Sequence, residues 1–179
     1  MWGVAGMTGT LLSKEFERGR RLHKLGIAGA AAQAAGGSPK SMAAVARAEE
    51  SLQKMGKAPE EGVSSWLASA AEVVGQMTAG FESPRAAVMT GAGAGTGAAV
   101  GALGGPLAPV TSTVGAGIGA TAGLVSHMVT DVYLVEGGLS YIELRKDKVD
   151  PGTAAALSHV VGVANAALEM TGTALVAKP

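Results

Sequence analysis

The 179-residue sequence has no cysteine and few aromatic or charged side chains. The lack of cysteine excludes disulfides, thiolate chemistry and zinc sites built on Cys ligands, and it does not decide the cellular compartment. Aromatic residues make up 3% of the chain and charged residues 16%, whereas a typical globular domain is about one quarter charged. The net charge is zero, which gives no argument for a nucleic-acid or strongly acidic partner.

Glycine and alanine stand where larger or charged residues would be expected. The chain has 28 glycines, and alanine is abundant in every segment. A core made of Ala and Gly buries little apolar area per residue. Burial must therefore be gained by close contact between helices or by oligomerisation.

Proline marks the expected helix starts. Ser or Asp precedes three of the four prolines concerned, where it can act as an N-cap; these are Pro39, Pro59, Pro84 and Pro151. No alternating strand pattern bounded by turn residues is seen. The sequence therefore predicts an all-α fold of about six helices, with Gly137-Gly138 as a candidate break in the fifth. The expected ranges are 8–35, 39–56, 60–80, 84–104, 109–146 and 151–176.

The most unusual feature is the run 86–130, which contains no Asp, Glu, Lys or Arg. Its glycines recur at every fourth position in two rows, separated by the helix-breaking residues 104–109. Residues four apart share one face of a helix, and glycine there lets another backbone approach closely. We therefore expect a glycine-zipper helical hairpin over 84–130, with these residues packing helices or subunits together: Gly93, Gly97, Gly101, Gly105, Gly115, Gly119 and Gly123.

The charge-free run is long enough for two passes of about 20 residues through an apolar layer of ~30 Å. Arg85 precedes the first pass and Asp131 follows the second, while Phe81 and Tyr133 stand just outside, where interfacial aromatic residues lie in membrane proteins. The first pass has few large apolar side chains, so a lone copy should insert poorly. We expect a membrane-interacting hairpin; the alternative is a soluble hairpin buried inside a large assembly.

Three regions are expected along the chain: an N-terminal helical region with amphipathic helices over 1–83, the Gly/Ala-rich hairpin over 84–130, and a C-terminal helical region over 131–179. Basic residues over 14–24 either face anionic lipid head groups or form ion pairs on a solvated helix face. The N-terminus does not fit a secretory signal peptide. The apolar C-terminal pattern is consistent with a segment of a longer polypeptide or a processed product.

Residues that could carry chemistry are few and incomplete. His127 and Asp131 are one helical turn apart, but a metal site needs a third and a fourth ligand. The pairs Ser126-His127 and Ser158-His159 lack a nucleophile elbow. The glycine-rich residues 91–97 lack the P-loop lysine and a preceding strand. The sequence therefore predicts no enzyme activity, cofactor, metal site or small-molecule substrate.

Two stretches, 138–154 (GLSYIELRKDKVDPGTA) and 161–169 (VGVANAALE), resemble a segment of very large bacteriophage virion proteins. These are internal virion or DNA-ejection proteins, some of which carry a lytic transglycosylase domain elsewhere. In that segment an aromatic-acidic helix end, a Val-Asp-Pro turn and an apolar helix follow one another. This chain has no transglycosylase motif, so that activity is not implied.

The resemblance implies a protein that is stored in the virion and expelled into the host cell envelope. There it would form a ring or tube with copies of itself and with other ejection proteins. Implied partners are host membrane lipids and passing DNA, which would be bound without sequence specificity. The leading interpretation is a non-enzymatic, homo-oligomeric conduit for genome delivery. A toxin or effector translocation segment and a soluble scaffolding protein are the alternatives.

Overall fold

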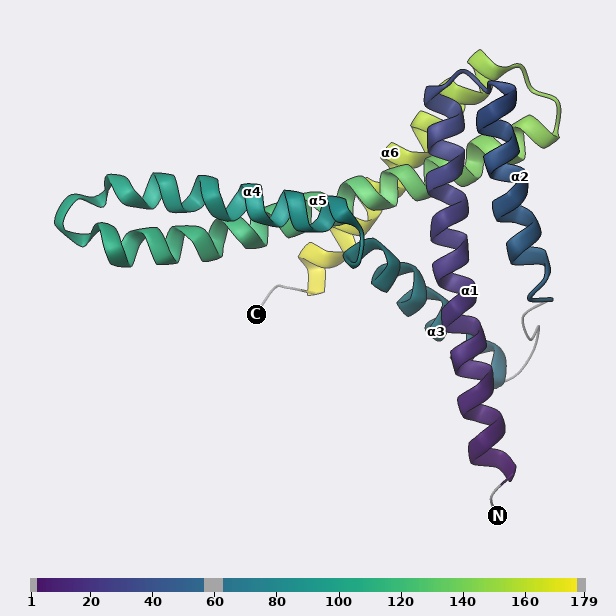
Figure 1. Ribbon diagram of the computed structural model, residues 1–179, viewed down its shortest axis with the longest axis horizontal. Coiled ribbons are helices and arrows are strands. Elements are labelled where there is room, and N and C mark those ends of the chain that lie inside the picture. The colour runs from purple at the N-terminus through teal and green to yellow at the C-terminus, as the bar shows by residue number, and fades with distance from the viewer. Residues whose placement is uncertain (1–2, 57–62, 177–179) are drawn as a thin grey trace. The chain divides into compact units, whose positions relative to one another are not determined.

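The computed structural model describes residues 3–56 and 63–176, with side chains described over 10–56, 68–103 and 105–171 (Figure 1). The chain is 91% helical, with six α-helices and no strand in its described part. The predicted all-α class and the number of helices are therefore confirmed.

Most helices begin and end close to the positions expected from the sequence, but the first begins at Gly3 where residue 8 was expected. In chain order they are α1 (Gly3–Ala34), α2 (Pro39–Gln53), α3 (Val63–Phe81), α4 (Pro84–Gly101), the 3₁₀ helix η1 (Ala102–Leu107), α5 (Ala108–Lys146) and α6 (Pro151–Val176).

Three of the proline-marked helix starts have the capping hydrogen bond that their sequences suggest. Ser38, Ser83 and Asp150 each accept a hydrogen bond from the backbone N–H three residues later, at 3.4, 3.2 and 3.0 Å. Each bond satisfies one of the N–H groups that lack a partner in the first turn of a helix. The fourth start, at Pro59, lies outside the described residues.

Two expectations about helix continuity change. The fourth helix ends at Gly101, earlier than expected, and continues as η1. In contrast, α5 runs through Gly137 and Gly138 without a break. A Cβ built on Gly138 would overlap the carbonyl oxygen of Gly26 in α1. Close packing at this point offsets the weak helix propensity of glycine.

The contacts divide the chain into two compact units. Unit 1 comprises residues 1–79 and 133–165, and unit 2 comprises residues 80–132 and 166–179. The regions before and after the hairpin, which the sequence treats as separate, thus largely belong to one unit. The hairpin of α4, η1 and the first part of α5 lies in unit 2.

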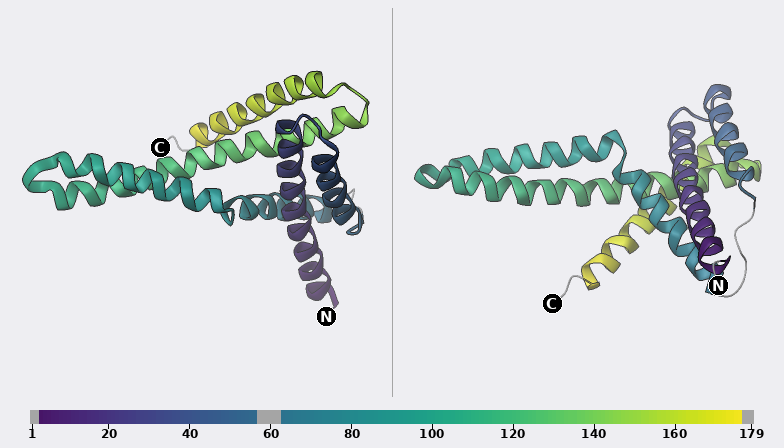
Figure 2. Two further views of the ribbon diagram at one scale, coloured as in Figure 1. Left: turned by 45° about the horizontal axis from the view of Figure 1, so that its top comes forward. Right: turned by 60° about the horizontal axis from the view of Figure 1, so that its bottom comes forward.

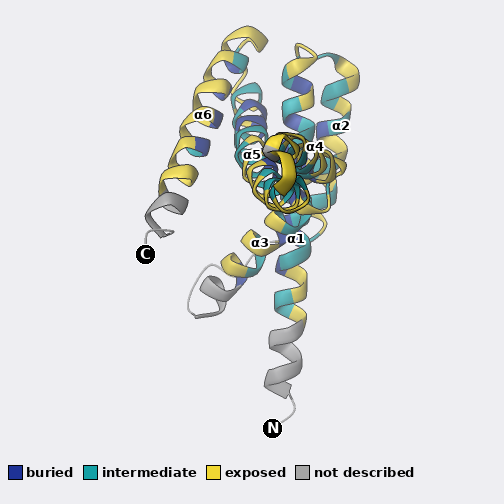
Figure 3. Cartoon of the chain, turned by 90° about the vertical axis from the view of Figure 1, so that its left-hand side faces the viewer, coloured by how far each residue is buried: buried dark blue, intermediate teal, exposed yellow. Residues whose placement is uncertain are grey.

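A small core lies in unit 1 where α1, α2, α5 and α6 meet. Its largest member is Tyr141, which is 0% exposed. Figure 2 shows α1 beside α2, and Figure 3 marks the buried positions in dark blue. The buried core residues are Leu25, Ala32, Val45, Tyr141, Ile142 and Ala154.

Glycines also form the helix crossings of unit 1. Where α1 meets α3, a Cβ on Gly19 would overlap the backbone of Glu72. Where α1 meets α5, a Cβ on Gly29 would overlap the carbonyl of Gly138. The backbones touch at both crossings, so helices poor in large side chains still pack without gaps.

The charged residues of α1 form ion pairs within unit 1. Glu15 is 1% exposed and accepts a hydrogen bond from Arg18 Nε at 2.6 Å, and the guanidinium of Arg18 also donates to the Gly56 carbonyl. Arg21 Nε lies 3.1 Å from the Glu17 carboxylate. Internal ion pairing was one of the two expectations, but Glu15 and Arg18 are buried where a solvated face was expected.

Candidate functional site

The two glycine rows of the hairpin face each other within unit 2. A Cβ built on Gly97 would overlap the carbonyl oxygen of Gly115, and one built on Gly93 would overlap that of Gly119. The same overlap occurs in the reverse direction for both pairs. Figure 1 shows α4 and the first part of α5 side by side, as backbone contact along both helices requires.

Near both ends of the hairpin, a glycine meets backbone that belongs to another residue type. A Cβ on Gly101 would overlap the backbone of Thr111, and one on Gly123 would overlap the carbonyl of Met89. The Thr111 hydroxyl also donates a hydrogen bond to the Gly101 carbonyl, which links α5 to α4 near the tip. The contact therefore runs from the base of the hairpin to its tip.

Gly105 does not take part in this contact, contrary to the expectation from the sequence. It lies in η1 with φ 59° and ψ −126°, and a Cβ there would have no described atom within 4 Å. Glycine adopts positive φ without the steric cost that other residues incur. Gly105 therefore serves the turn between the helices and not their packing.

Three other hairpin glycines lie outside the contact between α4 and α5. A Cβ on Gly91, Gly95 or Gly117 would meet no described atom within 4 Å. Gly95 and Gly117 each lie two residues from a packed glycine, on another face of the same helix. The hairpin thus offers matched pairs of packed and open glycines for mutagenesis.

The outer surface of the hairpin carries many exposed large apolar side chains, and Figure 3 marks much of the hairpin as exposed. Among the described residues, one helix, over 105–146, is long and apolar enough to cross a membrane, and only 11% of its most apolar window is buried. α4 is not such a helix. The exposed large apolar residues of the hairpin are Val88, Met89, Val100, Leu103, Leu107, Val110, Val114, Ile118 and Val125.

A groove of about 760 Å³ runs along the hairpin over the glycine rows. Its lining contains the packed glycines of both rows and larger apolar residues from both helices: Met89 and Val100 of α4, and Val110, Val114 and Ile118 of α5. A second hollow of about 630 Å³ lies beside it on α5 and shares Ile118 as a lining residue. Ile118 therefore lines both hollows, as do Ala122 and Ser126.

Hydroxyl groups on the hairpin bond back to their own helix. Thr96, Thr113 and Thr121 each donate to the carbonyl four residues earlier, at 2.9, 2.9 and 3.0 Å. A hydroxyl bonded in this way needs no partner from the surroundings. These threonines are therefore compatible with an apolar environment on the outside of the hairpin.

The base of the hairpin is joined by a buried histidine. His127 is buried, and its Nε2 lies 3.0 Å from the carbonyl oxygen of Gly80, at the end of α3. In the tautomer that carries its hydrogen on Nε2, the His127 ring donates to this carbonyl, which has no partner within the end of its helix. His127 thus has a structural partner, and among the described residues no group of three His, Asp or Glu could hold a metal ion.

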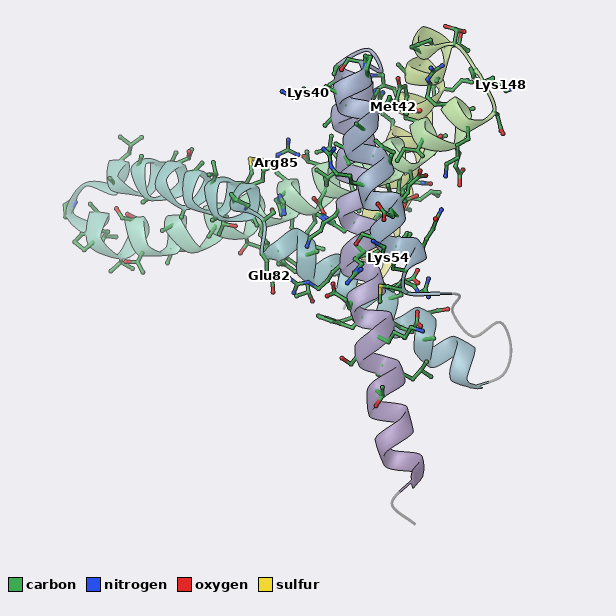
Figure 4. The ribbon with its side chains drawn as sticks, turned by 45° about the vertical axis from the view of Figure 1, so that its right-hand side comes forward. Lys40, Met42, Lys54, Glu82, Arg85 and Lys148 are labelled. Carbon is green, nitrogen blue, oxygen red and sulfur yellow. The ribbon has the colours of Figure 1, made fainter. Side chains whose placement is uncertain are left out.

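Three of the four residues proposed for a membrane interface lie at the base of the hairpin in unit 2. Phe81 and Arg85 are exposed, and Asp131 is half-buried with an interaction of its own. Figure 4 labels Arg85 at the start of α4 and Glu82 in the turn before it.

The fourth, Tyr133, belongs to unit 1. Its hydroxyl is hydrogen-bonded to His159 Nδ1 of α6, and the two rings stack with centroids 5.9 Å apart. A Cβ on Gly162 would lie 2.8 Å from the tyrosine ring. Tyr133 therefore joins α5 to α6 within unit 1, and its place at a membrane interface stays a prediction.

Comparisons of the chain with protein families, with curated proteins and with solved structures found no match. Function must therefore be argued from the hairpin itself. Sequence reasoning missed its groove, although a signal was present: Val110, Val114 and Ile118 recur every four residues beside the second glycine row. It also missed the glycine crossings of unit 1, which are scattered among charged and larger residues.

Proposed function

We propose that this protein is a non-enzymatic assembly component whose hairpin enters or lines a membrane conduit, as in phage DNA-ejection proteins. The observation that carries the proposal is the glycine-packed hairpin with an apolar outer surface. Its two helices are joined by backbone contact, so the large side chains are left for other surroundings. Patches of that kind on soluble proteins mark protein or membrane interaction sites.

The membrane part of the proposal is supported by one apolar helix and by the hydroxyls that bond internally. The conduit part follows from α4, which is too poor in large apolar groups to be held by lipid on every side. A helix of this kind is best accommodated between protein and lipid, as in a ring of several copies. The resemblance of 138–154 and 161–169 to virion proteins supports genome delivery as the purpose of the conduit.

Dye release from liposomes tests the membrane function. Gly97→Leu and Gly119→Leu would push the hairpin helices apart and should abolish release. Gly91→Leu and Gly95→Leu are the controls, because they add the same side chain on the hairpin where space is open and line neither hollow. They should retain release. A wild-type protein that causes no release under any assembling condition would leave a soluble scaffold as the better reading.

Particle analysis tests the phage assignment separately. Electron microscopy of the protein on liposomes should show rings or tubes, and mass spectrometry should find the protein in purified virions. Release without any virion association would overturn genome delivery and favour the toxin or effector translocation segment instead.

A further inference from the structure

We propose that the crossing of α1 and α3 is a pH-sensitive latch, which closes when the carboxyl groups of Glu72 and Glu15 share a proton. The residues of the latch belong to unit 1, and the inference does not depend on the function proposed for the hairpin. Because α3 is followed directly by the hairpin in the chain, the latch sets how firmly the segment that leads into the hairpin is held.

The backbones of α1 and α3 touch at this crossing. A Cβ built on Gly19 of α1 would overlap the Glu72 carbonyl oxygen, and one built on Gly75 of α3 would overlap that of Phe16. Helices in backbone contact cannot shift without losing that contact. Since the Glu72 backbone is part of the crossing, its side chain starts from a fixed point, and a change of charge on it acts on the contact between the two helices.

Two carboxyl groups share one guanidinium beside the crossing. Arg18 Nε lies 2.6 Å from Glu15 Oε2 and 3.9 Å from Glu72 Oε2. Glu72 is the one charged residue in the sequence of α3, so this helix brings a carboxyl group and no cation of its own. When both carboxyl groups are ionised, the cluster has an excess of one negative charge. Glu15 is 1% exposed, and an uncompensated charge next to a buried pair is unfavourable.

One oxygen of Glu15 lacks a hydrogen-bond donor. Glu15 Oε1 is buried and has no partner in the described part of the chain. Arg18 already donates from Nε to the other Glu15 oxygen and from its guanidinium to the Gly56 carbonyl. A protonated Glu72 carboxyl would give Glu15 Oε1 a donor and would also remove the excess charge. One proton thus corrects both defects of the cluster.

The titration of Glu72 has the sign that the latch requires. Burial raises the pKa of Glu72 above 4.5; Arg18 opposes this shift, and Glu15 adds to it. The docked state of α3 therefore binds the proton more tightly than the undocked state does. The gain in docking is fully present below pH 4.5 and is lost as pH rises through the raised pKa.

The other described charged groups near the crossing are exposed or form pairs of their own. They are Lys14 and Lys24, Glu17 with Arg20 and Arg21, and Glu50 with Lys54. His23 lies one turn beyond Gly19 on α1, is buried and has an interaction of its own. Acid adds a positive charge to a histidine but removes a negative charge from a carboxylate, so the variant His23→Gln separates the two sources of pH dependence.

Distances between spin labels test the latch in the full-length protein. Ser13 of α1 and Ser69 of α3 are exposed and the chain has no cysteine, so Ser13→Cys with Ser69→Cys takes two nitroxides. Double electron–electron resonance would be measured from about pH 4 to about pH 7.5. We expect one short distance at the acidic end and several-fold growth of a longer-distance population as the pH rises. Circular dichroism confirms that the helices are retained.

Three substitutions of Glu by Gln identify the groups that share the proton. Glu72→Gln keeps a donor for Glu15 without a charge, so the short distance should persist at every pH. Glu15→Gln leaves ionised Glu72 as the partner of Arg18, so the longer-distance population should grow as the pH falls, the reverse of the wild type. Glu50→Gln is the matched control, because Glu50 pairs with Lys54 on the exposed surface, and it should behave as the wild type.

Three results would overturn the inference. Wild-type distances that do not change with pH would show that no latch exists. A Glu15→Gln variant with the wild-type direction would show that Glu15 does not share the proton, and loss of the pH dependence in His23→Gln would assign it to the histidine. If Glu15→Gln fails to fold, ¹³C carboxyl resonances of the wild type decide: Glu15 and Glu72 should shift together as a coupled pair, and independent titrations would exclude a shared proton.

Discussion

The hairpin and unit 1 use the same glycine contacts but differ in what surrounds them. In unit 1, glycine crossings such as that of Gly29 with Gly138 lie beside a core that contains Tyr141 and Ile142. In the hairpin, glycine contact is nearly all that joins the two helices, and the large side chains face outward. Close backbone contact by itself does not show whether a region is a folded core or an assembly surface.

Unit 1 and the hairpin differ in whether their large side chains point into the fold or out of it. A helix pair that packs through glycine buries little apolar area, so its stability in water is small. Unit 1 also buries the Tyr141 side chain and has ion pairs on α1. The large apolar side chains of the hairpin are exposed and would be buried only by a partner or a membrane. Unit 1 should therefore be the stable part of the isolated chain, and the hairpin should open more easily.

The largest expected effect compares a core side chain with an outward one. Tyr141→Ala should lower the free energy of unfolding of unit 1 by about 3–5 kcal/mol, because it empties a fully buried site. Leu103→Ala in the hairpin should change the free energy of unfolding of unit 2 by less than about 0.5 kcal/mol, because Leu103 is 85% exposed. Chemical denaturation followed by circular dichroism measures both.

Tyr141→Phe is the control for this prediction. The Tyr141 hydroxyl is buried and has no hydrogen-bond partner in the described part of the chain. Its removal should be neutral or stabilising, since no hydrogen bond is lost. A loss as large as that of Tyr141→Ala would contradict a packing role for the ring.

The next effect compares a packed and an open glycine within the hairpin. Gly97→Ala should destabilise the closed hairpin by about 1–3 kcal/mol, because its methyl group would overlap the Gly115 carbonyl. Gly95→Ala should stabilise it by up to about 1 kcal/mol through helix propensity alone. Hydrogen exchange should show faster opening over 84–130 for Gly97→Ala only, with unit 1 unchanged. Equal effects from both substitutions would argue against the zipper.

A smaller effect depends on pH and concerns unit 1. Burial raises the pKa of Glu72 above 4.5; Arg18 opposes this shift, and Glu15 adds to it. A raised carboxyl pKa means that the folded state binds the proton more tightly, so this contribution is present below pH 4.5 and is lost as pH rises through the raised pKa. Glu72→Gln should remove this loss of stability with rising pH, which denaturation at a series of pH values measures. An unchanged pH profile in the variant would show that another group titrates.

The smallest effect concerns two helix caps, and here stability is lost as the pH falls instead of as it rises. Hydrogen bonds from Thr153 lower the pKa of Asp150 below 3.8, so the stability that this cap gives α6 is lost as pH falls through the lowered value. Ser83 caps α4 with a hydroxyl, so the hairpin start should show no such dependence. Asp150→Ser should make the two helix starts alike in amide exchange at low pH. Persistent acid sensitivity at α6 in that variant would exclude Asp150 as its source.

Much of the local structure could be predicted from single residues. Proline after Ser or Asp marked three helix starts, and the four-residue glycine spacing indicated which face of each hairpin helix would meet the other. Gly105 was assigned to the wrong role because spacing alone does not reveal positive φ. The contact of Tyr133 with His159 was also missed, because the two residues lie 26 positions apart.

The sequence by itself determined the all-α class, the caps and the hairpin, because these depend on propensities and spacings within a few residues. Only the folded chain shows which regions share a core, where Gly19, Gly29 and Gly138 touch other helices, and that Ile118 lines two hollows. Such contacts join residues far apart in the chain. Glycine has no side chain whose polarity could indicate what it packs against, so only the folded arrangement of the backbones shows where it packs.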